Sequence, residues 1–431
     1  MKKIARVFTY SLLNVFLFIG CQKETKSTSI ELSNPTSVKL TDKAISIDRS
    51  QLKENIDEGL APYVTASNGD NIPVQLDDLD GDTIWDALFF VADIPPNGKS
   101  MFTLEWKKGL QEFTAKTSVR FGKRLSADIP VKPALKEVML ANELPKSIGF
   151  QRYQTDGPSW ENDKVGFRHY LDGRNAKDLF AKKTAAITPE DVGLDENGAT
   201  VDNYHVMESW GRDVLWVGNS LGIGGYGLSD GTHLLRLGVT VEDAINNVEK
   251  TTFQIITEGP VRSQLKYTYD NWRPENTSNN YSVEETTTIW PGMYGYQNSV
   301  RFNGLVGNET MIVGLANSNT EQELTVLEEN EKFVVLYTHD KQTYEKVWTL
   351  GLALIVPKEV YLGSFEAPKE GRISNTFLAK IKVENNKAFQ YYALACWELS
   401  DKGFVNKDYF VNYLNDITNQ LAVEVIIRIS E

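Results

Sequence analysis

Residues 157–180, GPSWENDKVGFRHYLDGRNAKDLF, bring cations, a phenol and carboxylates close together. If DKVGFRHYLD is a strand, its side chains alternate between two faces. One face carries the polar set Lys164, Gly166, Arg168, Tyr170 and Asp172, and the other carries the core-like set Val165, Phe167, His169 and Leu171. The polar face is either the solvent side of an antiparallel sheet or the wall of a cleft for an acidic ligand. Trp160 before it and Arg174 after it favour the cleft.

A second cluster follows in residues 201–218, VDNYHVMESWGRDVLWVG. Its polar and aromatic members are Tyr204, His205, Trp210, Arg212 and Asp213. They precede the strand-like run DVLWVG, and functional groups are often carried by loops on a rigid scaffold. Among the four histidines of the chain, His205 has the most polar and aromatic surroundings. It is either a proton-transfer group or a hydrogen-bonded structural histidine.

The acidic run QLDDLDGDTIWDALFF resembles the first half of a calcium loop, with Asp78, Asp80 and Asp82 as candidate ligands. Thr83 replaces the turn glycine, and Phe89 replaces the bidentate glutamate. We therefore favour an Asp-Gly-Asp hairpin turn over a calcium site. The glycines at 222, 224 and 227 fit a dinucleotide motif, but no helical pattern follows them, so that interpretation is rejected. No spacing of zinc ligands is present. Neither a cofactor nor a metal is expected.

The elements that must position these residues are mostly strands. From about residue 35 to 112, short β-prone runs are divided by Asn-Gly-Asp, Asp-Gly-Asp and Pro-Pro-Asn-Gly turns, which predicts a small β-sandwich of immunoglobulin-like size. From about 135 to 431, more numerous and evenly spaced runs predict one large two-sheet sandwich. Helical periodicity is confined to short pieces, the clearest being KDYFVNYLNDITNQL. The chain is therefore predicted to be all-β with few short helices.

The first 20 residues have the pattern of a lipoprotein signal peptide. Lys2, Lys3 and Arg6 form a basic region, and residues 10–19 form an apolar run too short to span a bilayer. The run ends in FIGC, which resembles a bacterial lipobox and predicts acylation of Cys21. Residues 21–34 are polar and aperiodic, so we expect a tether. The protein is expected to be lipid-anchored in the outer membrane, at its periplasmic face or at the cell surface.

The formal net charge of −13 excludes a role in general nucleic-acid binding, because no basic tract offsets it. An anionic ligand would need positive side chains gathered in one cleft. The chain has two cysteines. Since Cys21 is assigned to the lipid and Cys396 lies in an apolar run, no disulfide is expected.

Three ordered runs, PVQLDDLDGDTIWDALFFVADI, GPSWENDKVGFRHYLDGRNAKDLF and YHVMESWGRDVLWVGNSLGIGGYG, resemble landmarks of a Bacteroidetes family with a domain of unknown function. That family includes the ulvan oligosaccharide dehydratase of marine flavobacteria, and its members are encoded among genes for degrading uronate polymers. The resemblance covers nearly all of the mature chain. It implies that the large domain is like the galactose-mutarotase sandwich and that the substrate is an anionic oligosaccharide of ulvan or of a related polymer such as pectin.

The implied reaction removes water across C4–C5 of a uronic acid residue at the non-reducing end and gives a 4,5-unsaturated uronate. The C5 proton is acidic enough only when the neighbouring carboxylate is neutralised, so cations must face that group. We assign Arg168 and Arg212 to a carboxylate clamp, because a guanidinium binds a carboxylate in a bidentate way. His205 is then the base, and Asp213 orients it.

The other residues complete the expected site. Tyr170 or Tyr204 is the acid or a second base. Lys164 binds a sulfate or carboxylate, while Trp160, Trp210 and Arg174 line the cleft. Two other functions fit the same residues: a polysaccharide lyase, which would shorten the polymer, and a glycan-binding lipoprotein without catalysis. The sequence does not indicate an oligomeric state.

Overall fold

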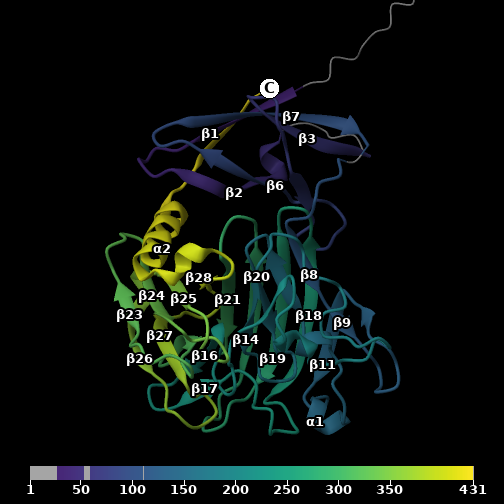
Figure 1. Ribbon diagram of the computed structural model, residues 1–431, viewed down its shortest axis with the longest axis vertical. Coiled ribbons are helices and arrows are strands. Elements are labelled where there is room, and N and C mark those ends of the chain that lie inside the picture. The colour runs from purple at the N-terminus through teal and green to yellow at the C-terminus, as the bar shows by residue number, and fades with distance from the viewer. Residues whose placement is uncertain (1–26, 53–58, 110, 431) are drawn as a thin grey trace, which may run out of the picture.

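The computed structural model describes residues 27–52, 59–109 and 111–430 of the 431-residue chain. The predicted signal peptide and the predicted acylation site Cys21 lie outside these residues. The described chain forms two β-sandwiches, with the small one above the large one in Figure 1. The predicted all-β class, in which a small N-terminal sandwich precedes a large one, is confirmed.

The small sandwich packs a five-stranded antiparallel sheet against a three-stranded one. The larger sheet has the order β29 (Ile426–Ser430), β1 (Ser27–Ser33), β7 (Lys99–Lys108), β3 (Leu60–Ala66) and β4 (Asn71–Ile72). The smaller sheet has the order β2 (Leu40–Asp48), β6 (Ala87–Ile94) and β5 (Val74–Asp77). Alternate apolar side chains face inward, and Ile30, Leu32, Leu88, Phe90 and Leu104 form part of the core.

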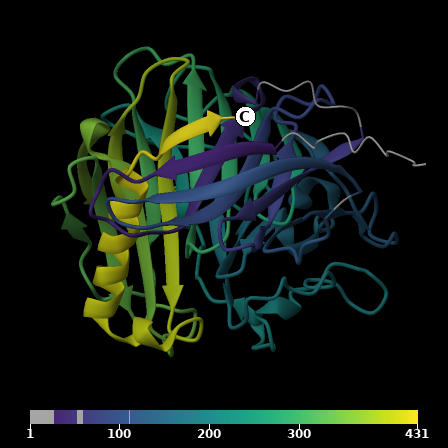
Figure 2. The ribbon, with the colours of Figure 1, turned by 90° about the horizontal axis from the view of Figure 1, so that it is seen from above.

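Both ends of the described chain meet in the small sandwich, which corrects two predicted boundaries. Ser27–Ser33, expected in the tether of residues 21–34, forms β1 because Ile30 and Leu32 are buried in the core. Ile426–Ser430, expected in the large sandwich of residues 135–431, forms β29 and pairs antiparallel with β1. Figure 2 shows this C-terminal strand, in yellow, above the large sandwich. The C-terminus therefore supplies an edge strand to the N-terminal sheet.

The large sandwich opposes a nine-stranded antiparallel sheet to two five-stranded sheets. The nine strands are, in order, β11 (Lys136–Leu140), β18 (Val248–Glu258), β19 (Ser263–Trp272), β20 (Tyr281–Ile289), β21 (Gly295–Asn303), β28 (Ala388–Trp397), β25 (Leu350–Pro357), β24 (Phe333–Asp340) and β23 (Thr325–Leu327). One five-stranded sheet has the order β15 (Gly211–Asp213), β14 (Lys177–Lys182), β13 (Val165–His169), β12 (Ser159–Asn162) and β8 (Thr117–Arg120). The other has the order β17 (Leu234–Arg236), β16 (Ile223–Ser229), β22 (Thr310–Ala316), β27 (Thr376–Lys382) and β26 (Tyr361–Glu366). A separate small pair joins β9 (Gly122–Lys123) to β10 (Lys132–Pro133).

Gly222 connects the two five-stranded sheets. Its backbone forms a parallel bridge with Lys177 of β14, immediately before β16 begins. The φ angle of Gly222 is +72°, and an added Cβ would lie 1.7 Å from the carbonyl oxygen of Lys177. Only glycine fits this close approach. A packing role for this glycine agrees with our rejection of a dinucleotide motif here.

The helical segments are short, apart from one. They are α1 (Pro145–Ile148), α2 (Lys407–Ala422) and single 3₁₀ turns at Arg49–Gln51, Gln154–Asp156, Asn203–His205, Lys358–Val360 and Lys402–Val405. The predicted helix KDYFVNYLNDITNQL is confirmed as part of α2, whose Phe410 and Leu414 are buried against the nine-stranded sheet. Within the described residues, no helix has the length and apolar character needed to cross a membrane.

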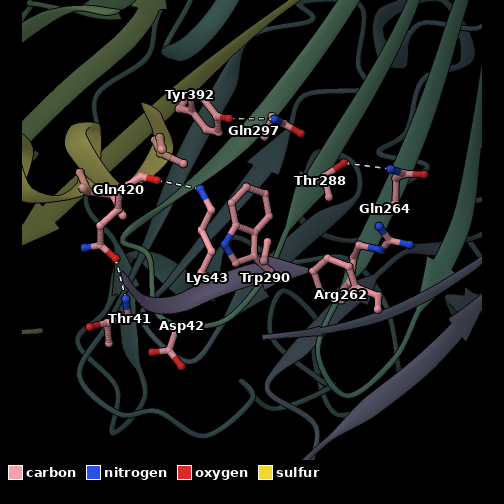
Figure 3. Close-up of a pocket in the computed structure, with 14 residues that line it drawn as sticks. Thr41, Asp42, Lys43, Arg262, Gln264, Thr288, Trp290, Gln297, Tyr392 and Gln420 are labelled. Carbon is pink, nitrogen blue, oxygen red and sulfur yellow. Dashed lines mark hydrogen bonds between the residues drawn. The ribbon is translucent and has the colours of Figure 1, made fainter. Parts of the chain in front are cut away.

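The two sandwiches meet at an interface that includes α2. Phe89 of β6 packs with Val261, Trp290 and Met293 of the large sandwich. Lys43 of β2 donates from Nζ to the carbonyl oxygen of Gln420, near the end of α2, at 2.7 Å. A polar cavity lies beside these contacts (Figure 3).

Candidate functional site

The polar face of β13 is covered by protein. Every residue of this strand is buried. Arg168 lies on this face. Tyr204 and Trp210 cover it, and they pack with Phe180 of β14 in a small apolar cluster. The sequence had left two alternatives for this face, the solvent side of a sheet or the wall of an open cleft, and the structure shows neither.

Arg168 is enclosed by acidic and aromatic groups, and its side chain is 1% exposed. Its Nη2 atom donates to Asp178 Oδ2 at 2.5 Å and to Asp213 Oδ2 at 2.6 Å. The guanidinium also lies 4.4 Å from the ring centre of Tyr170 and 4.8 Å from that of Tyr204. Because two buried carboxylates already bind this guanidinium, it is not available to a substrate carboxylate. The assignment of Arg168 to a carboxylate clamp is corrected.

The two tyrosine hydroxyls near Arg168 also have carboxylate partners. Tyr170 donates from its hydroxyl to Asp178 Oδ2 at 2.5 Å. Tyr204 donates to Asp202 Oδ1 at 2.8 Å. Burial raises the pKa of each phenol above its ordinary value, so both stay protonated at neutral pH. Their protons are directed at aspartates, which makes both residues supports of the site rather than free acids.

His205 lies at the outer edge of this network. The 3₁₀ turn Asn203–His205 places its ring 4.9 Å from the ring of Tyr204, and its side chain is 45% exposed. Its Nδ1 atom is 3.6 Å from Asp213 Oδ2. Burial lowers the pKa of His205, and the positive charges of Arg168 and Arg212 lower it further. The imidazole is therefore neutral at neutral pH and can accept a proton.

Asp213 links the buried arginine to the exposed histidine. Its side chain is 2% exposed, and burial raises the pKa of its carboxyl group, with a further increase from nearby Asp178. Asp156, 3.5 Å from Arg168, has its pKa raised to about 6, first by burial. Three acids thus surround one arginine, and the raised pKa values of Asp213 and Asp156 favour the protonated form of these two carboxyl groups.

Arg212 pairs with a glutamate that is partly exposed. Its Nη2 atom lies 2.7 Å from Glu345 Oε1, and the Glu345 side chain is 39% exposed. Its Nε atom donates to the backbone oxygen of Asp213 at 3.0 Å, and this bond holds the guanidinium in place. A guanidinium held in this way can exchange an exposed glutamate for a carboxylate of a ligand.

Two exposed aromatic residues complete this surface. Tyr344 has its ring 4.8 Å from that of Trp216 and 6.1 Å from that of His205. Trp216 and Tyr344 are 44% and 45% exposed. The Tyr344 backbone donates to the carbonyl oxygen of Val214 at 2.8 Å, which joins two distant segments. We call this surface the His205 patch; its residues are His205, Arg212, Trp216, Tyr344 and Glu345.

The sequence did not identify three members of the His205 patch. Trp216 follows β15 in DVLWVG, where Val214, Leu215 and Val217 are buried and only the tryptophan is exposed. The order of residue types gives no sign of that difference. Tyr344 and Glu345 lie in the loop after β24, more than a hundred positions along the chain, and no local pattern connects them to His205.

Three residues predicted to bind the ligand or line its cleft, Trp160, Lys164 and Trp210, lie outside the His205 patch. Trp160 is 1% exposed and packs in the core against Phe167 and Tyr296. Lys164 lies in the turn before β13, with its Nζ atom 5.8 Å from the ring of Tyr294. Trp210 is buried against Phe180. None of the three belongs to the His205 patch, so their roles in ligand binding stay predictions.

Arg174 is the fourth of these predicted residues. Its Nη2 atom pairs with Asp172 at 2.7 Å, and its guanidinium lies 3.5 Å from the ring centre of Tyr170. This arginine packs on the ring of Tyr170 and lies 4.0 Å from Asp156, so it supports the buried network. Its contacts give it a structural position rather than one in a ligand cleft.

A cavity of about 260 Å³ opens beside Tyr204 and Trp210. Its charged lining residues are Asp191 and Glu208, and none of the described residues that line it is a lysine or arginine. It therefore does not suit a uronate. The histidine that is half-exposed and the arginine that is paired with an exposed glutamate both lie in the His205 patch.

A buried polar network in the core of the large sandwich was also not foreseen. Lys177 Nζ lies 2.7 Å from Glu285 Oε1, and both side chains are fully buried. Tyr226 donates to the other Glu285 oxygen at 2.8 Å. His169 lies 3.3 Å from the Tyr269 hydroxyl, and burial, helped by the charge of Lys177, lowers its pKa to about 4. Because Lys177 and Glu285 are fully buried and Tyr226 bonds to the same carboxylate, these groups hold the two faces of the sandwich together.

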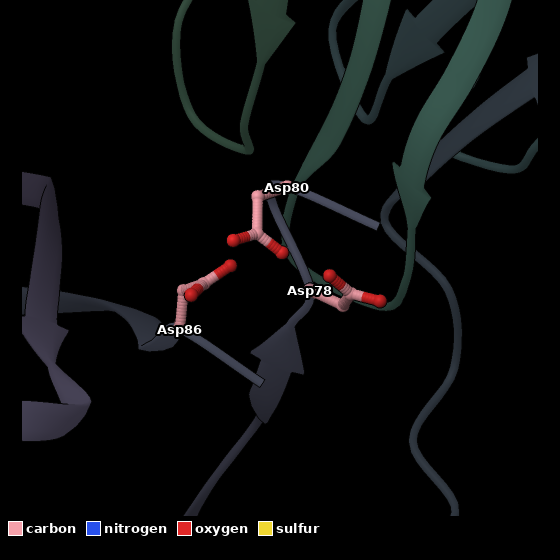
Figure 4. Close-up of side chains that lie close together, drawn as sticks. All are labelled: Asp78, Asp80 and Asp86. Carbon is pink, nitrogen blue, oxygen red and sulfur yellow. The ribbon is translucent and has the colours of Figure 1, made fainter. Parts of the chain in front are cut away.

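The acidic loop of the small sandwich forms a compact turn. Asp78, Asp80 and Asp86 have carboxylate oxygens within 4.8 Å of one another, and Figure 4 shows these side chains converging. Asp86 takes the place that the calcium-loop interpretation gave to Asp82, which instead accepts from the backbone N–H of Ile84 at 2.7 Å. Asp78 accepts from Gly81 at 2.7 Å, as expected for a turn of this type. Oxygen ligands of this kind suit a hard cation, but the local hydrogen bonds already account for the turn.

Comparison with known proteins identifies a family for this chain. A family model described as "Domain of unknown function (DUF4861)" matches residues 32–427. A curated relative, "Uncharacterized protein P7" from the marine flavobacterium Formosa agariphila, is 23% identical over 443 residues, which cover 98% of this chain and 99% of the relative.

Two solved structures from Enterococcus faecalis superpose on this chain. A protein in the glycosyl hydrolase family 38 superposes with a TM-score of 0.50 at 9% identity, and an alpha-mannosidase superposes with a TM-score of 0.49 at 10% identity. Each match covers 94% of this chain, which spans about half the length of those proteins, 47% and 46%. Because the family model covers most of the chain, this protein belongs to the family named for the domain of unknown function DUF4861.

Proposed function

We propose that this protein is a carbohydrate dehydratase that removes water across C4–C5 of a uronic acid residue at the non-reducing end of ulvan oligosaccharides. The observation that carries the proposal is the His205 patch, where a half-exposed imidazole is backed by buried Asp213 and stands beside Arg212. A fold like that of part of a glycosyl hydrolase family 38 protein agrees with a carbohydrate substrate. The choice of ulvan rests on the resemblance of the three sequence runs.

Arg212 binds the uronate carboxylate in this proposal. The incoming carboxylate displaces Glu345, which is exposed and can move into solvent. It then accepts hydrogen bonds from the guanidinium atoms that Glu345 has left. Neutralising the carboxylate lowers the cost of the negative charge that develops when C5 loses its proton. The faces of Trp216 and Tyr344 provide an apolar surface for the sugar ring.

His205 removes the C5 proton. Its lowered pKa keeps the imidazole unprotonated at neutral pH, and Asp213 on the Nδ1 side leaves Nε2 for the substrate. The electron pair of the C5–H bond forms the C4=C5 double bond, and the C4–O bond breaks. The leaving hydroxyl takes a proton and departs as water, so the atoms balance without a further reactant.

The acid in this step is His205 itself. The hydroxyls of Tyr170 and Tyr204 donate to Asp178 and Asp202, so neither is directed at a leaving group. Where the C5 hydrogen and the C4 hydroxyl lie on the same face of the ring, one imidazole can carry the proton from carbon to oxygen. Arg168 acts through Asp213 and is a positioning residue.

The remaining parts of the proposal concern location and partners. Acylation at Cys21 would anchor the protein in the outer membrane, with β1 beginning a few residues later at Ser27. The partners are then an anionic oligosaccharide and the membrane lipid, with no nucleic acid.

Mass spectrometry of saturated-end ulvan oligosaccharides incubated with the protein tests this function. A product lighter by one water, with new ultraviolet absorbance and an unchanged number of sugar residues, supports the dehydratase. Shortened chains with the same absorbance indicate a lyase instead. Unchanged spectra for ulvan, pectin and alginate fragments, together with retention on an ulvan column, indicate a glycan-binding protein.

A further inference from the structure

A second candidate binding site lies at the junction of the two sandwiches, on the outer face of the nine-stranded sheet. Gln264, Thr288, Gln297 and Tyr392 stand directly opposite one another on the neighbouring strands β19, β20, β21 and β28. Adjacent strands are about 4.8 Å apart. The four side chains therefore form one continuous polar row across the sheet.

This polar row lines a cavity of about 260 Å³. Trp290 lies next to Lys43, as Figure 3 shows, and Asp42 and Lys43 of β2 border the cavity on the side of the small sandwich. Gln420 of α2 lies on another side. Small-molecule sites occur preferentially at domain interfaces, with volumes of about 300–1,000 Å³. This cavity is close to the lower limit and suits a ligand the size of one sugar ring.

The hydrogen bonds within the row leave groups for a ligand. Gln264 Nε2 donates to Thr288 Oγ1 at 3.0 Å, and Gln297 Nε2 donates to the Tyr392 hydroxyl at 3.0 Å. Among the described residues, nothing donates a hydrogen bond to the side-chain oxygen of either glutamine. Each amide thus offers one acceptor and a second hydrogen, which is the pairing that a sugar hydroxyl requires. Trp290 adds an aromatic surface beside them.

The cations around the cavity are already bound by the protein. Arg262 donates from Nε to Asp77 Oδ2 at 2.7 Å, and both side chains are buried. Lys43 donates to the carbonyl oxygens of Gln420 and Val423 at 2.7 and 2.9 Å, which lie at the C-terminal end of α2. Asp42 adds a carboxyl group rather than a cation. Of the two cations in the lining, Arg262 is therefore paired with a carboxylate, and Lys43 has two of its three donors occupied by carbonyl oxygens. The lining is thus better suited to an uncharged ligand than to an anion, because Asp42 also stands in it.

We propose that this cavity binds one uncharged pyranose residue, with the sugar ring beside Trp290 and its hydroxyls bonded to Gln264 and Gln297. The site takes a different chemical class from the His205 patch, which is proposed to bind a uronate. Because its walls come from the small sandwich, the nine-stranded sheet and α2, a bound sugar would also join these three parts.

Saturation-transfer NMR on the full chain tests the proposal, with methyl β-D-glucopyranoside and methyl β-D-xylopyranoside as neutral probes and glucuronate for comparison. We expect saturation transfer to at least one neutral probe. In the Gln264→Leu/Gln297→Leu variant, its affinity should fall about tenfold, because two hydrogen-bonding amides are lost. The matched control is Gln254→Leu, an exposed glutamine on β18, which should bind as the wild type does.

Absence of transfer to both neutral probes would overturn the proposal, as would unchanged binding in the double variant. If the double variant does not fold, the two single variants give the same comparison. Glucuronate binding that is insensitive to these substitutions belongs to another site. Water elimination is measured separately, so failure at the cavity and failure at the His205 patch are distinguishable.

Discussion

Nδ1 of His205 lies 3.6 Å from Oδ2 of Asp213, and the same carboxylate oxygen accepts a hydrogen bond from Arg168 at 2.6 Å. Buried Asp213, which is bonded to Arg168, thus stands behind the half-exposed imidazole of His205. The arrangement divides the roles of the two arginines that the sequence had grouped. Arg168 organises the interior of the site, and Arg212 is the arginine with a replaceable partner.

His205→Ala is expected to lower turnover by about 10²–10⁴-fold, because the proposed base is removed. The measurement is the initial rate of ultraviolet absorbance increase on uronate-ended oligosaccharides. The matched control is His233→Ala: this histidine is 44% exposed and lies 3.1 Å from Asp230, so it has a similar pairing at a different place. A His205→Ala enzyme as fast as the control would show that the base is elsewhere.

The pH dependence of the rate follows from the environment of His205. Burial and the charges of Arg168 and Arg212 lower its pKa below the usual value of about 6.5. A base acts only when unprotonated, so kcat/KM should be constant at neutral pH and should fall as pH drops through that lowered pKa. Arg212→Gln removes one of the positive charges and should move the acid limb to higher pH. A limb that does not move, or that moves to lower pH, contradicts the assignment.

Arg212 and Glu345 make opposite predictions for binding. Arg212→Gln should raise KM about tenfold or more, because the carboxylate loses a charged hydrogen-bonding partner. Glu345→Gln should lower KM, because a competing carboxylate is removed from the same guanidinium. Steady-state kinetics of both variants, with exposed Arg273→Gln as the control, measure this. A higher KM for Glu345→Gln would mean that this ion pair supports the site and does not compete with substrate.

Arg168→Met should destabilise the fold rather than only the reaction. The substitution leaves Asp178 and Asp213 buried without their cation, and breaking a buried pair in this way costs about 3–5 kcal/mol. Urea unfolding at neutral pH measures the loss, and Arg273→Met, at a side chain 60% exposed, is the control. A loss below about 1 kcal/mol would show that Arg168 is not the partner on which these carboxylates depend.

Much of the architecture was predictable because it follows from alternation. Strand runs divided by turn signals gave the all-β class, and the spacing of Phe410 and Leu414 gave α2. The edge strands of the small sandwich were harder to predict from the sequence. Ser27–Ser33 contributes only a few apolar side chains, and its partner β29 comes from the other end of the chain.

The site was predictable only in part. Tyr204, His205, Arg212 and Asp213 are neighbours in sequence, so their types could be read together. The burial of Arg168 could not be predicted from the sequence, because it depends on an irregular segment that folds back over β13. Lys164 and Arg168 share a predicted face, yet four residues of strand separate them by about 13 Å.

The central claim is that the C5–H bond of a uronate is broken beside His205. The most direct test uses a uronate-ended oligosaccharide that carries deuterium at C5, followed by mass spectrometry of the product. The account predicts a product that has lost the C5 deuterium and the C4 oxygen, formed by the wild type and by His233→Ala but not by His205→Ala. A product that retains the deuterium, or that forms equally well in His205→Ala, would contradict it.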